Sequence, residues 1–403
     1  MILLALILLT IMIAIKGFSI MNEFMCFGEP NIGCNIDDEF VDRYVHQLSS
    51  IMRSKSFSAN SLVEEFERKF SFTFNEENFS LITNATTALE LALYVVKLES
   101  GFAHVVTQAI GFFGVHSMVL SRGYSLTLCD VQKTSFDFDY SELETKLLNG
   151  ANVILVTHMN GIPVNMKSVT DIAKKVSHIT KRKIWIIDDL SRSLGAKIDS
   201  CNISKFSDFS VFSFQSKKHM TLLGEGGGVV CKDSAHVDFI KAARGFGNKK
   251  TYGFNHKISF SQVLFGLNAL DIVQEQIDKR ISMGLSRDKA ISKIGFFDFL
   301  YPDTIDFKCT YYLYTLKINE KYPSEIRDQI INILKSKGIG CSIANFPVYK
   351  ISDFLNSHLN FPVCKNADNL GQRIFSVSMH PSFSDKDEEH IINSLCEIAN
   401  AYR

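Results

Sequence analysis

The residues ANVILVTHMNGIPVNMKSVTDIAKKVSHITKRKIWIIDD, from Ala151 to Asp189, show the repeating unit of the chain. They begin with a short continuous apolar run, continue with apolar residues at three- and four-residue spacing, and end in a second apolar run. Short continuous apolar runs are typical of strands buried on both faces, and the spaced pattern is typical of an amphipathic helix. The order strand, helix, strand predicts neighbouring strands of one parallel sheet.

The same alternation of apolar runs and helical patterns extends through the chain to about Lys249. Two helical patterns precede it in residues 36–74, and a long helical stretch follows in residues 264–292. The remainder mixes strands and helices on a smaller scale. We therefore expect an α/β fold. Residues 21–274 would form a large domain with a mostly parallel central sheet flanked by helices, and residues 275–403 a smaller α+β domain.

The first 20 residues form a separate apolar extension, because the run from Met1 to Ile15 contains no charge. This run is shorter than the roughly 20 apolar residues that span a bilayer, and it lacks the basic start and cleavage site of a signal peptide. Three interpretations compete. The extension is a non-native start, with Met21 or Met25 as the true one; it is a membrane anchor; or it is a helix packed on the core. Membrane contact is expected only through residues 1–15, and the protein is otherwise expected in the cytoplasm.

The overall composition excludes several classes of function. Lys and Arg together number 43, as do Asp and Glu, so the net charge is zero and no basic surface for nucleic acid is indicated. The nine cysteines show no metal-binding spacing, and we expect neither a metal site nor a disulfide framework.

The residues that close the apolar runs are candidates for a ligand site, because ligands bind at the carboxyl ends of strands in an open parallel sheet. Asp189 ends the run KIWII, where a carboxylate is costly unless it is paired. Such an aspartate is commonly a helix cap or half of an ion pair. Together with the lysines of FSFQSKKHMTLLGEGGG (212–228) it also meets the needs of pyridoxal phosphate. The acid would keep the pyridine nitrogen protonated, and the lysine would form the Schiff base and move protons.

A phosphate site is indicated by TNATTALELAL (83–93), where a strand ends and a helix begins. Free backbone N–H groups and the positive end of the helix converge at such a point. An ordinary helix cap by Asn84 or Thr86 would explain the same residues. Ser213 could add a hydroxyl, and Phe112 or Phe113 could lie on the cofactor ring.

Seven segments in the right order resemble the DegT-type sugar-nucleotide aminotransferases, which are pyridoxal-phosphate enzymes of fold type I. The resemblance extends from about Gly28 to near the end of the chain. It rests on NATTAL, QAIGFF, VTHMNG, DDLSRSLGA, SFQSKKHMTLLGEGG, GFNHKI and VSMHPSFS.

The resemblance implies roles for the cofactor site. Asp189 would contact the pyridine nitrogen, and Phe112 would stack on the ring. The phosphate would be held by Ala85, Thr86 and Ser213.

The resemblance also implies a homodimer with shared active sites, because Asn255 would reach the phosphate site of the neighbouring subunit. Arg192 stands where the family usually has a glutamine beside the phenolic oxygen of the cofactor. His256 and Lys257 replace an aromatic residue and an arginine, and lysine cannot reproduce the bidentate arginine fork.

The position of the cofactor-binding lysine is found by counting residues along the sequence, and two such counts differ by one residue. Counting forward from Ser213 places it at Lys218, whereas counting back from the glycine-rich turn places it at His219. We favour Lys218, because the end of a strand fixes the first spacing and an extra residue in a turn is easily absorbed. Lys217 would then be a neighbour that is exposed or faces the substrate.

The resemblance therefore predicts an aminotransferase that uses pyridoxal 5'-phosphate, with an amino acid, by family habit glutamate, as the donor. The acceptor would be the ketone of a nucleotide-linked keto-deoxysugar, for amino-sugar or surface polysaccharide synthesis. One alternative is a sugar 3-dehydratase with His219 as the base. Another is an inactive protein of the same fold that serves as a sensor or assembly factor.

Overall fold

The computed structural model describes residues 33–55, 57–248, 251–302, 305–343, 345–360 and 362–402. The predicted apolar extension, residues 1–20, lies outside the described residues, so its three interpretations stay predictions. Among the helices that are described, none is long and apolar enough to cross a membrane.

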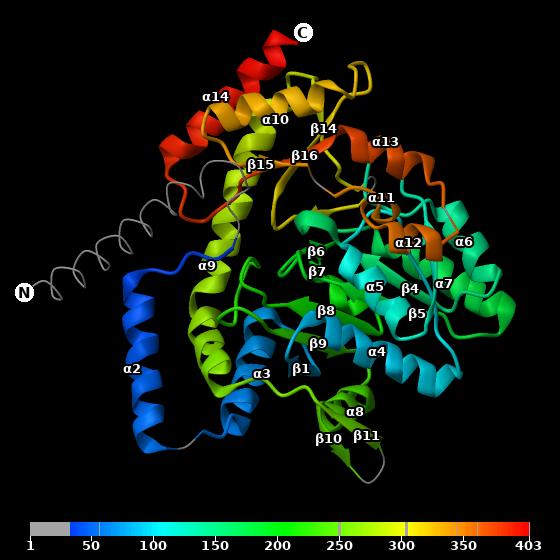
Figure 1. Ribbon diagram of the computed structural model, residues 1–403, viewed down its shortest axis with the longest axis vertical. Helices are drawn as coiled ribbons and strands as arrows, with labels where there is room; N and C mark the ends of the chain where they lie inside the picture. The colour runs from blue at the N-terminus through cyan, green and yellow to red at the C-terminus, as the bar shows by residue number, and fades with distance from the viewer. Residues whose placement is uncertain are drawn as a thin grey trace, which may run out of the picture.

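A seven-stranded sheet forms the centre of the larger part of the molecule (Figure 1). In this sheet β9 runs antiparallel to both of its neighbours, and the other strands share one direction. The prediction of a mostly parallel central sheet is confirmed. In order across the sheet the strands are β1 (Phe79–Ile82), β9 (Gly227–Cys231), β8 (Phe209–Ser213), β5 (Trp185–Asp189), β4 (Val153–Thr157), β2 (His104–Gln108) and β3 (Ser125–Cys129).

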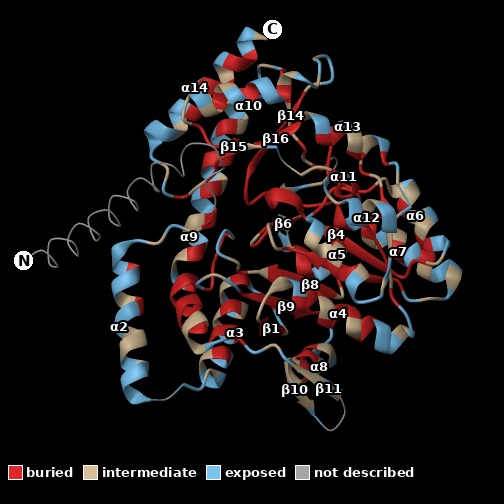
Figure 2. Cartoon of the chain, viewed as in Figure 1, coloured by how far each residue is buried: buried red, intermediate tan, exposed pale blue. Residues whose placement is uncertain are grey.

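Alternate side chains of each strand enter two different hydrophobic layers. Ile186 in β5 packs into one layer, whereas Trp185 and Ile187 pack into the other. Because both faces are covered, the inner strands can be apolar without interruption (Figure 2). The first layer is covered by α3 (Asn60–Phe74), α6 (Tyr140–Leu148), α7 (Met166–Thr180) and part of α9 (Phe260–Ile291), and the second by α4 (Ala85–Ser100), α5 (Phe113–Ser121) and α8 (Ser234–Arg244).

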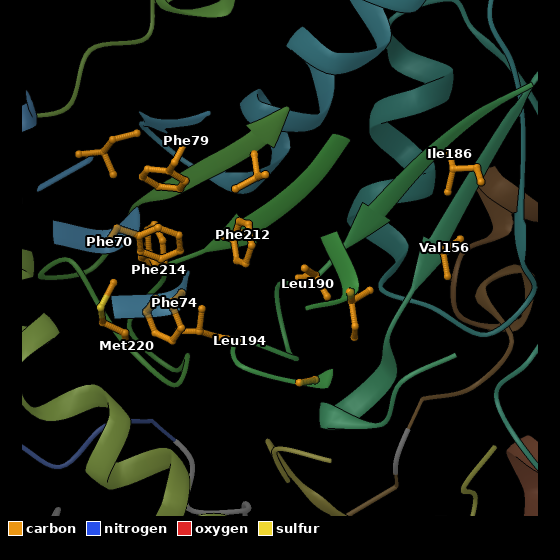
Figure 3. Packing of buried hydrophobic residues seen from close by; sticks show 14 of the residues in the cluster. Phe70, Phe74, Phe79, Val156, Ile186, Leu190, Leu194, Phe212, Phe214 and Met220 are labelled. Atoms are coloured by element: carbon orange, nitrogen blue, oxygen red, sulfur yellow. The ribbon is translucent and has the colours of Figure 1, made fainter. Parts of the chain in front are cut away.

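Phenylalanine side chains fill the first layer beside β1 and β8 (Figure 3). The Phe70 ring stacks on Phe79 with 4.0 Å between centroids and meets the edge of Phe212 at 5.4 Å. Phe214, the first residue after β8, is fully buried against the same rings. This packing holds the start of the segment that carries the lysines, because large buried rings leave little room for movement.

The C-terminal part is built on a smaller antiparallel sheet covered by helices, as the α+β prediction requires. Its strands, in order across the sheet, are β12 (Phe297–Asp298), β14 (Tyr314–Ile318), β16 (Ile374–Val377) and β15 (Cys341–Ser342). Its longer helices are α10 (Ile326–Ser336), α13 (Lys365–Arg373) and α14 (Asp385–Ala401).

The helix α9 belongs to both parts of the molecule (Figure 1). It runs without interruption through Gln274, the predicted domain boundary. Ile277 packs into the first layer of the large sheet, whereas Met283 and Ile291 pack into the core of the C-terminal part. The division of the chain at residue 274 stays a prediction, since one rigid helix serves both cores.

The remaining elements lie around these two cores. The helix α2 (Asp38–Ser54) packs on α9 through Phe40, whose ring lies 4.8 Å from that of Phe265. A hairpin of β10 (Gly245–Asn248) and β11 (Thr251–Asn255) projects from the part of the molecule that contains the large sheet, at the bottom of Figure 1. The short elements are η1 (Met159–Gly161), β6 (Lys197–Ile198), β7 (Cys201–Asn202), η2 (Ile203–Phe206), β13 (Phe307–Lys308), α11 (Val348–Ile351) and α12 (Asp353–His358).

Candidate active site

A cavity of about 440 Å³ lies at the edge of the large sheet where the parallel strands end. Residues from the ends of β1, β4, β5 and β8 line it, together with one residue from the C-terminal part. The lining residues are Asn84, Ala85, Thr86, Leu89, Phe112, Val115, Thr157, His158, Met159, Asp189, Ser191, Arg192, Val211, Ser213, Gln215, Lys217, Lys218, Glu225 and Tyr312. This is the place where an open parallel sheet binds ligands.

The start of α4 forms one wall of the cavity. Asn84 caps the helix, because its side-chain oxygen accepts a hydrogen bond from the Thr87 amide at 2.8 Å. The amides of Ala85 and Thr86 precede that bond and carry the positive end of the helix. Asn84 is therefore an ordinary helix cap, and Ala85 and Thr86 line the cavity beside it. The phosphate site stays a prediction.

Gly227 brings the hydroxyl of Ser213 to the same wall. It pairs with Ile82 of β1 and with Ser213 of β8, so the ends of two parallel strands meet at this glycine. A Cβ atom at Gly227 would collide with the backbone of Asn84 and Ala85. The glycine-rich turn thus permits the close approach that places a serine hydroxyl next to a helix N-terminus.

The two adjacent aspartates at the end of β5 face opposite ways. Asp189 lines the cavity and accepts a hydrogen bond from the Ser191 amide at 2.9 Å. Asp188 does not line it; its carboxylate accepts from Ser207 and Ser210 and lies 3.6 Å from His158 Nε2. The period of two along a strand explains the difference. Of the two aspartates, Asp189 is therefore the one that faces the cavity.

Lys218 extends into the cavity from the segment after β8. Burial, with a further contribution from the nearby Arg192 guanidinium, lowers the pKa of its amine from 10.5 to about 8, against the opposing charges of Asp189 and Glu225. A lysine with this pKa carries a larger neutral fraction near neutral pH, and the neutral amine is the form that attacks a carbonyl. Lys217 also lines the cavity, with an exposed side chain.

His219 points away from the cavity, although it is the next residue. It is 2% exposed, and its Nε2 lies 3.1 Å from the Thr310 carbonyl oxygen. Burial lowers the pKa of its imidazole to about 3, and the Arg280 guanidinium contributes to that shift. The imidazole is therefore neutral and engaged with the backbone, which favours Lys218 as the reactive side chain.

Arg192 lies in the cavity with a guanidinium held by amides. Its Nη1 donates to Asn160 Oδ1 at 2.9 Å and to Asn345 Oδ1 at 3.2 Å. Its Cζ lies 5.9 Å from the ring centroid of Phe112, which is half exposed at the cavity. Among the described residues, no carboxylate lies within ion-pair distance of Arg192. A cation in this position can receive an anionic oxygen.

Asn255 does not line the cavity of its own chain. It is the last residue of β11 in the projecting hairpin, and its side chain is exposed. The prediction that it reaches the phosphate site of a neighbouring subunit is not tested by a single chain, and it stays a prediction.

Several lining residues were absent from the sequence-based site, and Tyr312 is the clearest case. It comes from the C-terminal part and is 4% exposed, with its ring centroid 5.3 Å from Lys218 Nζ. Asn160 and Asn345, which hold Arg192, were missed as well. Tyr312 and Asn345 lie in loops and Asn160 in the short helix η1, and none of the three shows a local pattern. The end of a strand is recognisable in sequence, but the distant loop that packs over it is not.

The lining meets the three needs of pyridoxal phosphate. Amides at a helix N-terminus and the Ser213 hydroxyl suit a phosphate. Asp189 suits a protonated pyridine nitrogen, and Lys218 supplies an amine with a depressed pKa. The donor set therefore fits this cofactor.

Known proteins that resemble this chain include aminotransferases, and the resemblance extends along nearly the whole chain. The model of the DegT/DnrJ/EryC1/StrS aminotransferase family matches residues 38–396. A UDP-4-amino-4,6-dideoxy-N-acetyl-beta-L-altrosamine transaminase of Campylobacter jejuni is 26% identical over 376 residues, which cover 90% of this chain and 96% of that protein. A GDP-perosamine synthase of Escherichia coli O157:H7 is 23% identical over 347 residues, covering 84% of this chain and 91% of that protein.

A solved structure of a sugar aminotransferase from Streptococcus pneumoniae in its PLP form has a similar fold. The TM-score is 0.79 at 20% sequence identity, and the match covers 94% of this chain and 100% of that chain. At this identity the likeness concerns the fold.

Proposed function

Since the chain belongs to the DegT/DnrJ/EryC1/StrS aminotransferase family, we propose that it transfers an amino group to the ketone of a nucleotide-linked keto-deoxysugar with pyridoxal 5'-phosphate as cofactor. The donor would be an amino acid, glutamate by resemblance to the family. The names of the Campylobacter and Escherichia relatives, which concern UDP- and GDP-linked amino sugars, support this substrate class.

One observation carries the proposal: Lys218 and Asp189 line the same cavity, opposite the N-terminus of α4. When bound, pyridoxal phosphate supplies an aldehyde that a lysine amine can attack and a ring that draws electrons from the substrate. The amides of Ala85 and Thr86, with Ser213, would hold its phosphate. Phe112 would cover the ring, and Arg192 would donate to the phenolic oxygen.

Asp189 and Lys218 would have different roles in proton transfer. Asp189 would keep a proton on the pyridine nitrogen, because a carboxylate facing that nitrogen stabilises its charged form. Lys218 would act both as the attacking amine and as the base that removes the proton from the amine-bearing carbon of the donor. An amine whose pKa is near 8 can both take up and release a proton at neutral pH.

A homodimer is part of the proposal. Asn255 stands on an exposed hairpin, and its amide would reach the phosphate site of a second copy. The exposed aromatic side chains of Phe246 and Tyr252 on the same hairpin support a covered surface there.

The dehydratase alternative has less support. It requires the imidazole of His219 as a base within the cavity, whereas that ring is buried outside it and bonded to the backbone. No observation favours an inactive sensor, because the groups that the cofactor needs line one cavity.

The test compares two adjacent lysines in the full-length protein. Lys218→Ala should abolish the visible absorbance that pyridoxal phosphate gains on attachment to the protein, and with it the transfer of the amine. Lys217→Ala, the matched control, should keep the absorbance. Wild-type protein that gains no such absorbance, or Lys218→Ala protein that keeps turnover, would contradict the proposal.

A further inference from the structure

Tyr312 presents a phenol hydroxyl at the wall of the cavity. The side chain is 4% exposed and lines the cavity. Among the described residues, none forms a hydrogen bond with its hydroxyl. The hydroxyl oxygen is not among the fully buried polar atoms that lack a partner, so it is open to the cavity and can donate a hydrogen bond to a ligand there.

The protein holds this side chain in a fixed place. The Thr310 amide donates to the Gly161 carbonyl at 3.0 Å, and a Cβ atom at Gly161 would lie only 2.5 Å from the Tyr311 amide nitrogen. The buried Arg280 guanidinium lies 3.4 Å from the Tyr311 carbonyl oxygen and 3.5 Å from that of Tyr312. The segment is therefore clamped from two sides, and the phenol cannot move away to find another partner.

The surroundings place the phenol beside the reacting centre. Its ring centroid lies 5.3 Å from Lys218 Nζ and 5.4 Å from Arg192 Cζ, which is within the range of cation–π contacts. Any group that reacts next to the Lys218 amine therefore passes close to Tyr312. Burial raises the pKa of the phenol, so it stays a neutral hydrogen-bond donor at neutral pH.

A neutral hydroxyl suits one of the two substrates better than the other. The carboxylates of an amino acid are drawn to cations rather than to a neutral phenol, and the cavity lining includes lysine and arginine side chains. The hydroxyl and keto oxygens of a sugar carry no charge and pair well with a phenol.

We propose that Tyr312 is a specificity-determining residue for the sugar substrate. Its hydroxyl donates a hydrogen bond to an oxygen of the sugar beside the carbon that receives the amine. This inference rests on the proposed function and adds a sugar contact from the C-terminal part of the chain.

The test measures the two half-reactions separately in Tyr312→Phe protein loaded with pyridoxal phosphate. Glutamate is the probe for the donor side. UDP-4-amino-4,6-dideoxy-N-acetyl-beta-L-altrosamine, run in the reverse direction, is the probe for the sugar side. We expect the KM for the amino sugar to rise about tenfold or more, because one hydrogen bond to substrate is lost. The reaction with glutamate should stay within about twofold of wild type.

A binding measurement gives a second readout that does not depend on turnover. Calorimetric affinity for the same amino sugar nucleotide should fall by a similar factor when Tyr312→Phe is added to Lys218→Ala protein. Tyr311→Phe is the matched control, because that hydroxyl bonds Asp288 instead of facing the cavity. It should leave the ratio of the two half-reactions unchanged.

The outcomes separate this inference from the function on which it rests. Wild-type protein that takes no amine from glutamate contradicts the proposed function. Wild-type protein that reacts with both probes, together with a Tyr312→Phe variant that matches it in both, contradicts only the role of Tyr312. Equal losses in both half-reactions contradict that role as well, since they would indicate a general effect on Lys218.

Discussion

Two clusters of polar residues in this molecule contain the same residue types: aspartate, arginine and tyrosine. They differ in the hydrogen-bond partners that the protein provides for these side chains. Asp288 in α9 accepts hydrogen bonds from Tyr301 at 2.6 Å, Tyr311 at 2.7 Å and Tyr314 at 2.9 Å. Asp189 in the cavity accepts only the Ser191 amide among the described residues. Both carboxylates are partly or fully buried, but only the carboxylate of Asp288 accepts hydrogen bonds from several protein side chains.

The arginines and tyrosines follow the same division. Arg287, next to Asp288, forms a bidentate pair with Glu388 at 2.6 and 2.8 Å, whereas Arg192 has amide partners and, among the described residues, no carboxylate within ion-pair distance. Tyr311 bonds Asp288, whereas the hydroxyl of its neighbour Tyr312 has no hydrogen-bond partner among the described residues. Complete hydrogen bonding within the protein is typical of a centre that stabilises the fold, and polar groups left open to a cavity are candidates for binding a ligand.

The largest expected effect concerns Asp189. Asp189→Asn should lower kcat by about 10²- to 10⁴-fold, because the cofactor nitrogen loses the charge that keeps it protonated. The free energy of unfolding should change by less than about 0.5 kcal/mol, since the carboxylate makes one protein hydrogen bond. Steady-state kinetics and urea unfolding measure the two quantities. A large loss of stability would place Asp189 in the structural class with Asp288.

The reverse pattern is expected for Asp288. Asp288→Ala leaves three phenol hydroxyls without their acceptor, and it should lower the free energy of unfolding by about 3 kcal/mol. Turnover per folded molecule should stay within about twofold of wild type. Denaturant unfolding with activity measured on the folded fraction tests this, and a selective loss of turnover would refute the contrast.

Lys218 should reveal its lowered pKa in a pH profile. The folded protein favours the neutral amine, so between about pH 8 and the ordinary lysine value of 10.5 the unfolded chain binds more protons than the folded one. Stability should therefore rise with pH across that window. Lys218→Met should remove this rise and raise stability below pH 8, because a desolvated cation is replaced by an apolar side chain. Thermal unfolding between pH 7 and 10.5 measures it; identical slopes for the two proteins would count against the buried amine.

The smallest expected effect separates the two adjacent tyrosines. Tyr311→Phe should cost about 1 kcal/mol of unfolding free energy, because it removes a hydrogen bond to a carboxylate. Tyr312→Phe should change the unfolding free energy by less than about 0.5 kcal/mol, because no described residue forms a hydrogen bond with its hydroxyl. Urea midpoints of the two variants, measured side by side, decide the matter, and equal costs would show that Tyr312 has a structural partner.

The large sheet and most of the residues at its carboxyl edge could be predicted from the sequence. Both follow from the pattern of residues along short stretches of the chain. Apolar runs such as VILVT and WIID are buried on both faces of the sheet, and the residues that close them reach its carboxyl edge. Lys218, Asp189 and Ser213 were found in this way, and they line one cavity. The choice between Lys218 and His219 was harder, because the spacing of the turn allows both.

Residue order alone therefore specifies the strands, the helices and the side of the sheet on which chemistry can occur, since these follow from periodicity along a few neighbouring residues. The assignment of each polar side chain to cavity or core depends on packing between segments far apart in the chain. His219 can be buried because the Thr310 carbonyl oxygen pairs with its imidazole. Tyr312 lies at the cavity because Gly161 and Arg280 contact the backbone of its segment. Such contacts leave no local pattern, and they exist only once the two parts of the fold have closed on each other.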